Sequence, residues 1–129
     1  MHIDHINLRA PAGQLDHLRD FYCTVLGLEE GFRPDFASRG YWLYANERPL
    51  VHLSLGRPPS GPATRGDPDI GLNHVAFRSS GVDGLRARLD EHGVPYRLSY
   101  VAELDLSQLF FTDPVGTGLE VNFPGERVR

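Results

Sequence analysis

Two stretches of the chain alternate polar and apolar residues with a period of two, which is typical of strands with one buried face. His5–Arg9 have this pattern near the N-terminus, and His74–Arg78 repeat it in the second half of the chain. Each stretch contains a histidine, alternate apolar residues and a closing arginine. The repetition predicts a chain built from two similar halves.

An apolar stripe with helical spacing follows each of these strands. The stripe residues are Leu15, Leu18, Tyr22, Val25 and Leu26 in the first half, and Val82, Leu85 and Leu89 in the second. Gly27 and Gly93 are expected to end the two helices, because glycine readily takes the left-handed conformation of a helix C-terminus. Ser80 and Asp83 have the spacing of a capping box, which predicts the start of the second helix.

The remaining apolar stretches are short and predict three further strands in each half. They are Glu30–Arg33, Gly40–Ala45 and Leu50–Leu55, then Tyr96–Val101, Leu109–Thr112 and Leu119–Phe123. Residues 46–49 and 113–116 are expected to form turns. Each half is therefore predicted as β-α-β-β-β, giving an α+β fold with mixed sheets.

The domain boundaries follow from a segment rich in proline and glycine. We expect one domain over residues 1–129, with modules at 1–56 and 70–125 and a linker at 57–69. Because one helix covers only one face of a sheet, the two sheets are expected to meet as a cup.

Composition excludes several classes of partner. The chain has 129 residues and a net charge of -4, and its 13 basic residues are all arginines without a basic run. Nucleic acid is therefore not an expected partner. No apolar run is long enough to span a membrane, the start of the chain does not have the pattern of a signal peptide, and the single cysteine, Cys23, fits a reducing compartment. These features predict a cytoplasmic protein.

Three histidines and one carboxylate fall on the polar faces of predicted strands. His5 and His74 lie on the first strand of each half, and His52 and Glu120 lie on the last. Because neighbouring residues of a strand point to opposite faces, their apolar neighbours are expected to pack on the helix while all four point into the cup. Three imidazoles and a carboxylate suit a divalent transition metal (Fe, Mn, Co, Ni or Zn) better than Ca or Mg. His52 has an alternative position outside the first coordination shell, where it would donate to a ligand or a substrate.

Further polar side chains are candidates for contact with a small-molecule substrate. Arg9 and Arg78 could clamp an anion, while Tyr41, Tyr100 and Asn122 could orient a substrate oxygen. Glu120 is the candidate catalytic base as well as a ligand.

Four segments resemble the vicinal oxygen chelate superfamily, which includes glyoxalases, extradiol ring-cleaving dioxygenases, fosfomycin-resistance enzymes, methylmalonyl-CoA epimerase and bleomycin-binding proteins. The segments are His5–Leu8, Phe21–Leu28, Leu72–Phe77 and Phe111–Val121. Within the last of them, residues 113–120 keep the frame Asp-Pro-x-Gly-x-x-x-Glu. The resemblance implies paired β-α-β-β-β modules with a metal held by the first and last strands of each module.

The resemblance leaves the reaction open, because one fold hosts several chemistries. Four protein ligands leave two sites for a substrate that chelates through two oxygens, which favours glyoxalase-like or epimerase-like lyase or isomerase chemistry. Ring cleavage by Fe(II) needs a third open site, and therefore needs His52 outside the first shell. A non-catalytic binding or resistance protein would instead use an aromatic groove of Tyr41, Trp42, Tyr44, Phe110 and Phe111. Long strand edges lead us to expect a homodimer.

Overall fold

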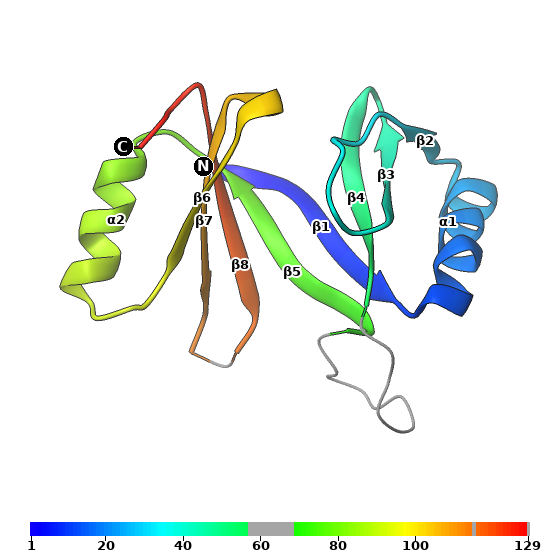
Figure 1. Cartoon of the computed structure of the whole chain (residues 1–129), viewed down its shortest axis with the longest axis horizontal. Helices are drawn as coiled ribbons and strands as arrows, with labels where there is room; N and C mark the ends of the chain where they lie inside the picture. Colours follow the sequence, from blue (N-terminus) through cyan, green and yellow to red (C-terminus); the bar gives the residue numbers. More distant parts are fainter. Residues whose placement is uncertain (57–68, 115, 129) are drawn as a thin grey trace. The chain divides into compact units, whose positions relative to one another are not determined.

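The computed structural model describes residues 1–56, 69–114 and 116–128. Its first half contains β1 (His2–Ala10), α1 (Ala12–Leu26), β2 (Glu29–Gly31), β3 (Gly40–Ala45) and β4 (Arg48–Leu55). Its second half contains β5 (Gly71–Arg78), α2 (Val82–Glu91), β6 (Arg97–Val101), the 3₁₀ turn η1 (Ala102–Leu104), β7 (Leu106–Thr112) and β8 (Gly118–Pro124). This order confirms the predicted α+β class and the strand-helix-three-strand plan of both halves (Figure 1).

The chain divides into two compact units. We call residues His5–Asn73 the first unit, and Met1–Asp4 together with His74–Arg129 the second unit. Except for Asp69, the predicted linker lies outside the described residues.

In the first unit, the strands follow the order β2-β3-β4-β1, with β1 parallel to β4 and the other pairs antiparallel. The apolar face packs against α1 and forms one core of Leu8, Ala10, Leu15, Leu43, Val51 and Leu53. The predicted alternation is therefore confirmed for β1 and β4. Gly27 ends α1 in the left-handed region, with φ 75°.

The hairpin between β3 and β4 is tighter than the sequence predicts. Asn46 and Glu47 alone form the turn, and both have positive φ, at 51° and 65°. Two left-handed residues match the twist of paired strands, so β4 starts at Arg48 rather than at Leu50.

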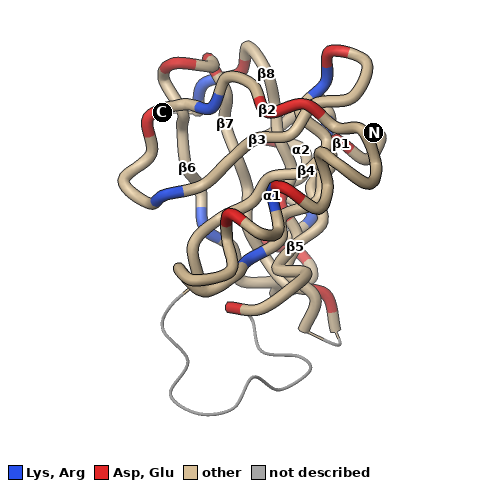
Figure 2. The backbone as a smooth tube through the Cα atoms, turned by 90° about the vertical axis from the view of Figure 1, so that its right-hand side faces the viewer, with Lys and Arg blue, Asp and Glu red and all other residues tan. Residues whose placement is uncertain are grey.

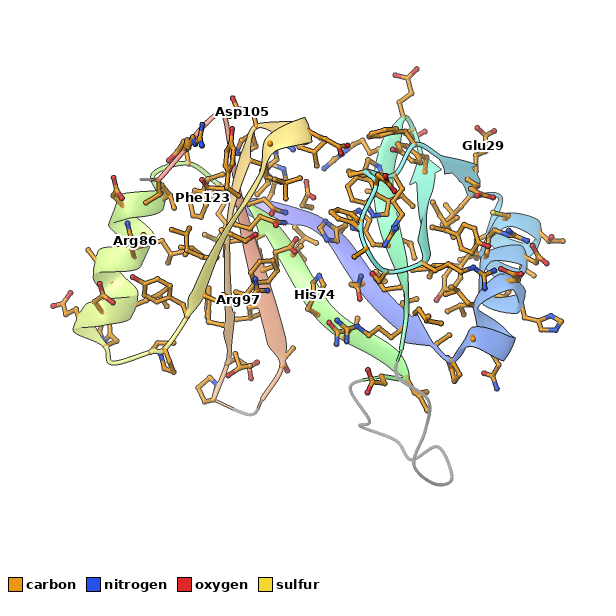
Figure 3. All side chains as sticks on the ribbon, viewed as in Figure 1. Glu29, His74, Arg86, Arg97, Asp105 and Phe123 are labelled. Carbon is orange, nitrogen blue, oxygen red and sulfur yellow. The ribbon has the colours of Figure 1, made fainter. Side chains whose placement is uncertain are left out.

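In the second unit, the strands follow the order β5-β8-β7-β6, with β5 parallel to β8 and the others antiparallel. The core on the α2 side consists of Val82, Leu89, Leu109, Val121 and Phe123. Figure 3 shows Phe123 between the sheet and α2. As in the first unit, a single helix buries one face of the sheet, and the polar positions of β5 and β8 fall on the other face.

The predicted capping box at Ser80 and Asp83 is wrong. α2 has Gly81 at its N-cap with φ 83°, and neither predicted side chain caps the helix. Instead, the carboxylate of Glu126 accepts hydrogen bonds from the backbone N–H groups of Gly81 (2.8 Å) and Val82 (2.9 Å). A carboxylate from the C-terminal segment thus satisfies the exposed donors at the positive end of the helix dipole.

Charged residues of both signs are interspersed along the backbone (Figure 2). Among the described residues, neither helix has the length and apolar character needed to cross a bilayer.

Glu126→Ala should lower the free energy of unfolding by about 1 kcal/mol, because two helix N–H groups lose a charged acceptor. Urea denaturation followed by circular dichroism measures this change. Glu103→Ala is the matched control, since Glu103 is an exposed carboxylate on η1. Equal denaturation midpoints for Glu126→Ala and the control would refute the capping role.

Candidate metal centre

The first unit places two of the predicted ligands in direct contact. His5 on β1 and His52 on β4 are both buried, and their rings stack with centroids 3.5 Å apart and planes inclined by 15°. Trp42 of β3 lies opposite His52 in the strand register and stacks on it at 4.0 Å. The ring of His52 is therefore in contact with an aromatic ring on both faces.

The edge of the His52 ring also has a defined partner. Its Nε2 lies 3.1 Å from the carbonyl oxygen of Pro49. A hydrogen bond at this position requires a hydrogen on Nε2, because a carbonyl oxygen can only accept.

The second unit brings the other two predicted ligands together. His74 lies on β5, and Glu120 on the neighbouring strand β8, with Nε2 of His74 3.7 Å from Oε1 of Glu120. Figure 3 labels His74 on its strand. Only 5% of Glu120 is exposed, although a buried carboxylate is costly without compensation. The 3.7 Å separation is too long for a hydrogen bond. It suits two ligand atoms that each lie ~2.1 Å from a shared ion.

The four predicted ligands thus form two pairs, one in each unit. Both pairs lie on the sheet face opposite the helix, as period-two alternation requires. In both units, the two members come from parallel neighbouring strands, β1 with β4 and β5 with β8.

The two predicted anion clamps share the ligand face of their strands. Arg9 pairs with Asp69 at 3.5 Å, and 37% of its side chain is exposed. Arg78 pairs with Asp4 at 3.7 Å, and half of its side chain is exposed. Both side chains are thus partly exposed, which leaves each one within reach of an anionic group.

The two candidate tyrosines lie on the opposite, helix-facing side. Tyr41 is opposite Leu53 of the core, and its hydroxyl donates to Asp16 of α1, which lowers the pKa of that carboxyl. In the second unit, Tyr100 donates to Asp105 at 2.6 Å, and this hydrogen bond raises the pKa of the phenol. Both hydroxyls therefore make structural contacts on this face.

The aromatic residues considered for a ligand groove do not share one face. Trp42 and Phe110 are the register partners of His52 and Glu120. Tyr41 and Phe111 pack against the two cores instead. The hydroxyl of Tyr44 donates to the carbonyl oxygen of Phe32.

Two polar residues near Glu120 were not predicted from the sequence. Arg97 of β6, labelled in Figure 3, lies over the ring of Phe110 at 4.3 Å. Gln108 of β7 donates to Asn122, and Asn122 donates to Glu120. Counting alternate residues from Phe110 finds Gln108, because the two share a strand face.

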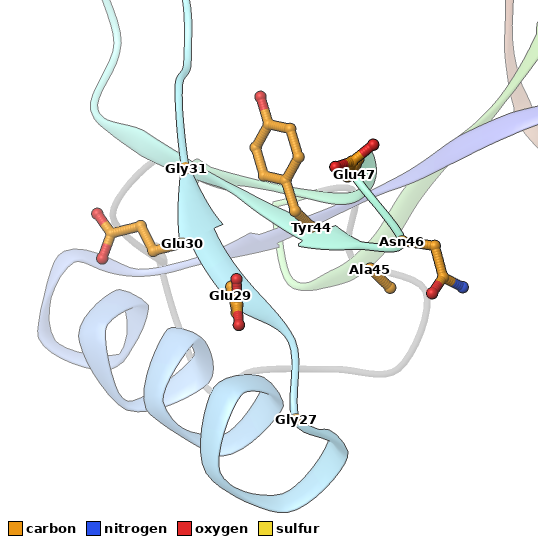
Figure 4. A pocket seen from close by; sticks show the side chains of 8 residues that line it. All are labelled: Gly27, Glu29, Glu30, Gly31, Tyr44, Ala45, Asn46 and Glu47. Atoms are coloured by element: carbon orange, nitrogen blue, oxygen red, sulfur yellow. The ribbon is translucent and has the colours of Figure 1, made fainter.

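A separate pocket lies beside the β3–β4 hairpin. It is lined by Gly27, Glu29, Glu30, Gly31, Tyr44, Ala45, Asn46 and Glu47 (Figure 4). Tyr44 of the predicted aromatic groove lines it, but none of the predicted metal ligands, anion clamps or substrate-orienting residues does, and its charged groups are exposed carboxylates.

Two β-α-β-β-β units with polar strand faces opposite their helices define the class of glyoxalase-like α+β proteins. A family model described as the Glyoxalase/Bleomycin resistance protein/Dioxygenase superfamily matches residues 2–121. The chain belongs to this superfamily. A comparison with curated proteins finds no match.

Solved structures share this fold at low sequence identity. Methylmalonyl-CoA epimerase from Mycobacterium tuberculosis is 20% identical, with a TM-score of 0.67 over 95% of this chain and 87% of its own. The Mn(II)-bound glyoxalase from Novosphingobium aromaticivorans is 23% identical, with a TM-score of 0.68 over 98% of this chain and 38% of its own. The 2,3-dioxygenase LapB from Pseudomonas sp. KL28 is 18% identical, with a TM-score of 0.71 over 95% of this chain and 40% of its own. At these identities the likeness establishes the fold alone.

Proposed function

We propose that the protein is a metal-dependent enzyme that binds a small oxygenated substrate through two of its oxygens. His5, His74 and Glu120 are the proposed ligands of a divalent transition metal, and His52 is the fourth candidate. The observation that carries the proposal is the pairing of half-buried His74 with buried Glu120, whose ligand atoms are 3.7 Å apart. The buried histidine pair of the first unit, at the matching strand positions, supports it further.

The donor set fits a borderline divalent ion, because imidazole and carboxylate together suit Fe, Mn, Co, Ni and Zn. When bound, such an ion would polarise a carbonyl or enolate oxygen of the substrate as a Lewis acid. We propose that the two pairs serve one ion, brought together within one chain or across two chains of a dimer. Superfamily membership supports this role, as does the similarity to a glyoxalase described as Mn(II)-bound.

For the reaction, we favour lyase or isomerase chemistry of the glyoxalase or epimerase kind. Such chemistry removes a proton beside a carbonyl, and Glu120 would act in turn as a metal ligand and as the base that accepts this proton. Its burial excludes water from the carboxylate. Arg9 and Arg78 would hold an anionic part of the substrate, since both are partly exposed on the ligand faces.

One observation favours a second candidate, an extradiol-type ring-cleaving dioxygenase using Fe(II). An imidazole nitrogen binds a metal in the plane of its own ring. The rings of His5 and His52 are nearly parallel and 3.5 Å apart, so their lone pairs point along two separate planes. This stack supports His52 as an outer partner, which leaves the two-histidine, one-carboxylate set with open positions that oxygen activation needs.

We also propose that the protein is a cytoplasmic homodimer. β2 and β6 are edge strands of their sheets, and α1 exposes Phe21, Val25 and Leu26. Unpaired edges and apolar surface favour association.

Light scattering should give a mass of about 29 kDa, twice the mass of one chain. A mass near that of one chain at high protein concentration would contradict the dimer.

His74→Ala should weaken binding of Mn(II) or Co(II) by more than about 100-fold, because loss of an inner ligand costs more than loss of an outer partner. Calorimetric titration of the metal-free full chain measures the affinity. The control is His17→Ala, since His17 is exposed on α1. Wild-type protein that binds no divalent metal, or His74→Ala with wild-type affinity, would overturn the proposed function.

His52→Ala in the same titration separates the two reactions. A loss as large as that of His74→Ala identifies His52 as a ligand and supports isomerase or lyase chemistry. Retained metal binding, together with oxygen uptake on a catechol by the wild type, supports ring cleavage instead.

A further inference from the structure

Glu120 is hydrogen-bonded to a neighbouring amide on its own strand. Asn122 follows two residues later on β8, so its side chain is on the same face as the carboxylate. Its Nδ2 donates to Oε2 of Glu120 at 3.0 Å. Only 3% of Asn122 is exposed. Because Oε2 accepts this bond while Oε1 lies nearer His74, the two carboxylate oxygens have different surroundings.

The side-chain amide of Gln108 holds the amide of Asn122 in place. Gln108 is the register partner of Asn122 on the adjacent strand β7, and its Nε2 donates to Oδ1 of Asn122 at 3.0 Å. Both polar atoms of the Asn122 side chain are therefore engaged by groups of the second unit.

The two hydrogen bonds run in one direction, from the donor Gln108 through Asn122 to the acceptor Glu120. An ionised carboxylate only accepts, so Asn122 must turn its NH₂ group toward Glu120. The side-chain carbonyl oxygen of Asn122 then faces β7. This oxygen can only accept a hydrogen bond, and the NH₂ group of Gln108 donates one. Reversing either amide would bring two acceptors together. The chain Gln108 to Asn122 to Glu120 thus holds the carboxylate in one orientation.

We propose that Asn122 and Gln108 are positioning residues that present Oε1 of Glu120 to the metal ion and reserve Oε2 for the amide. This inference rests on the proposed function, because it assumes that Glu120 is a ligand. It gives Asn122 a different role from the substrate contact expected from sequence. Buried polar partners of this kind fix the geometry of a ligand before the metal arrives.

Asn122→Ala should weaken Co(II) binding to the metal-free full chain by about 10- to 100-fold, the usual effect of losing an outer partner of a ligand. It should also change the Co(II) absorption spectrum, because the carboxylate is free to rotate or to bind through both oxygens. Gln108→Ala should weaken binding by a smaller factor. The double variant should bind no more weakly than Asn122→Ala, because Gln108 acts only through Asn122. Gln14→Ala, which removes an exposed amide on α1, is the matched control.

Wild-type affinity and spectrum in Asn122→Ala would overturn the positioning role while leaving the metal site intact. Additive losses in the double variant would also overturn it, since they would mean that the two amides act separately. If Asn122→Ala does not fold, as judged by circular dichroism, Gln108→Ala decides: weakened binding supports the relay, and wild-type affinity overturns it. Failure of the wild type to bind Co(II) would instead overturn the proposed function, and this inference with it.

Discussion

Each unit has one helix, and a strand alternates its side chains between two faces; this constraint determines where the ligand-type residues lie. The apolar residues of β1 and β4 must face α1, and those of β5, β8 and β7 must face α2. The residues that alternate with them, among them His5, His52, His74 and Glu120, are then placed on the opposite face. A register shift of one residue would bury the ligand-type side chains in the core, so the apolar core specifies the position of the candidate site.

The two units hold their last-strand residue by different interactions. In the first unit, His52 lies between the rings of His5 and Trp42, and its edge contacts a backbone carbonyl. In the second, Glu120 is held by the amide of Asn122. An imidazole offers two apolar faces for stacking, whereas a carboxylate needs hydrogen-bond donors when it is buried. His52 and Glu120 stand at matching positions of the repeat. Because one is an imidazole and the other a carboxylate, the first needs aromatic neighbours and the second needs a hydrogen-bond donor.

Sequence alone predicted the order of elements, the strand faces that pack on the helices and the strands on which the ligand-type residues lie. These features depend on periodicity, and periodicity is visible in the sequence. The cap of α2 was missed because Glu126 is 45 residues from Gly81, and no local pattern connects them. The contacts of Trp42 and Gln108 were missed for a related reason, since they depend on the register of antiparallel strands. The residue type of Tyr41 favours a contact with substrate. Its partner on β4 is the core residue Leu53, however, so Tyr41 packs against the core.

We propose that histidines from both units bind one ion. X-ray absorption at the metal edge of protein loaded with one equivalent of Co(II) tests it most directly, because imidazole ligands scatter in a way that allows them to be counted. We expect a nitrogen and oxygen shell at ~2.1 Å with at least two imidazoles, from His5 and His74, and a carboxylate oxygen. A shell with one imidazole or none would contradict it.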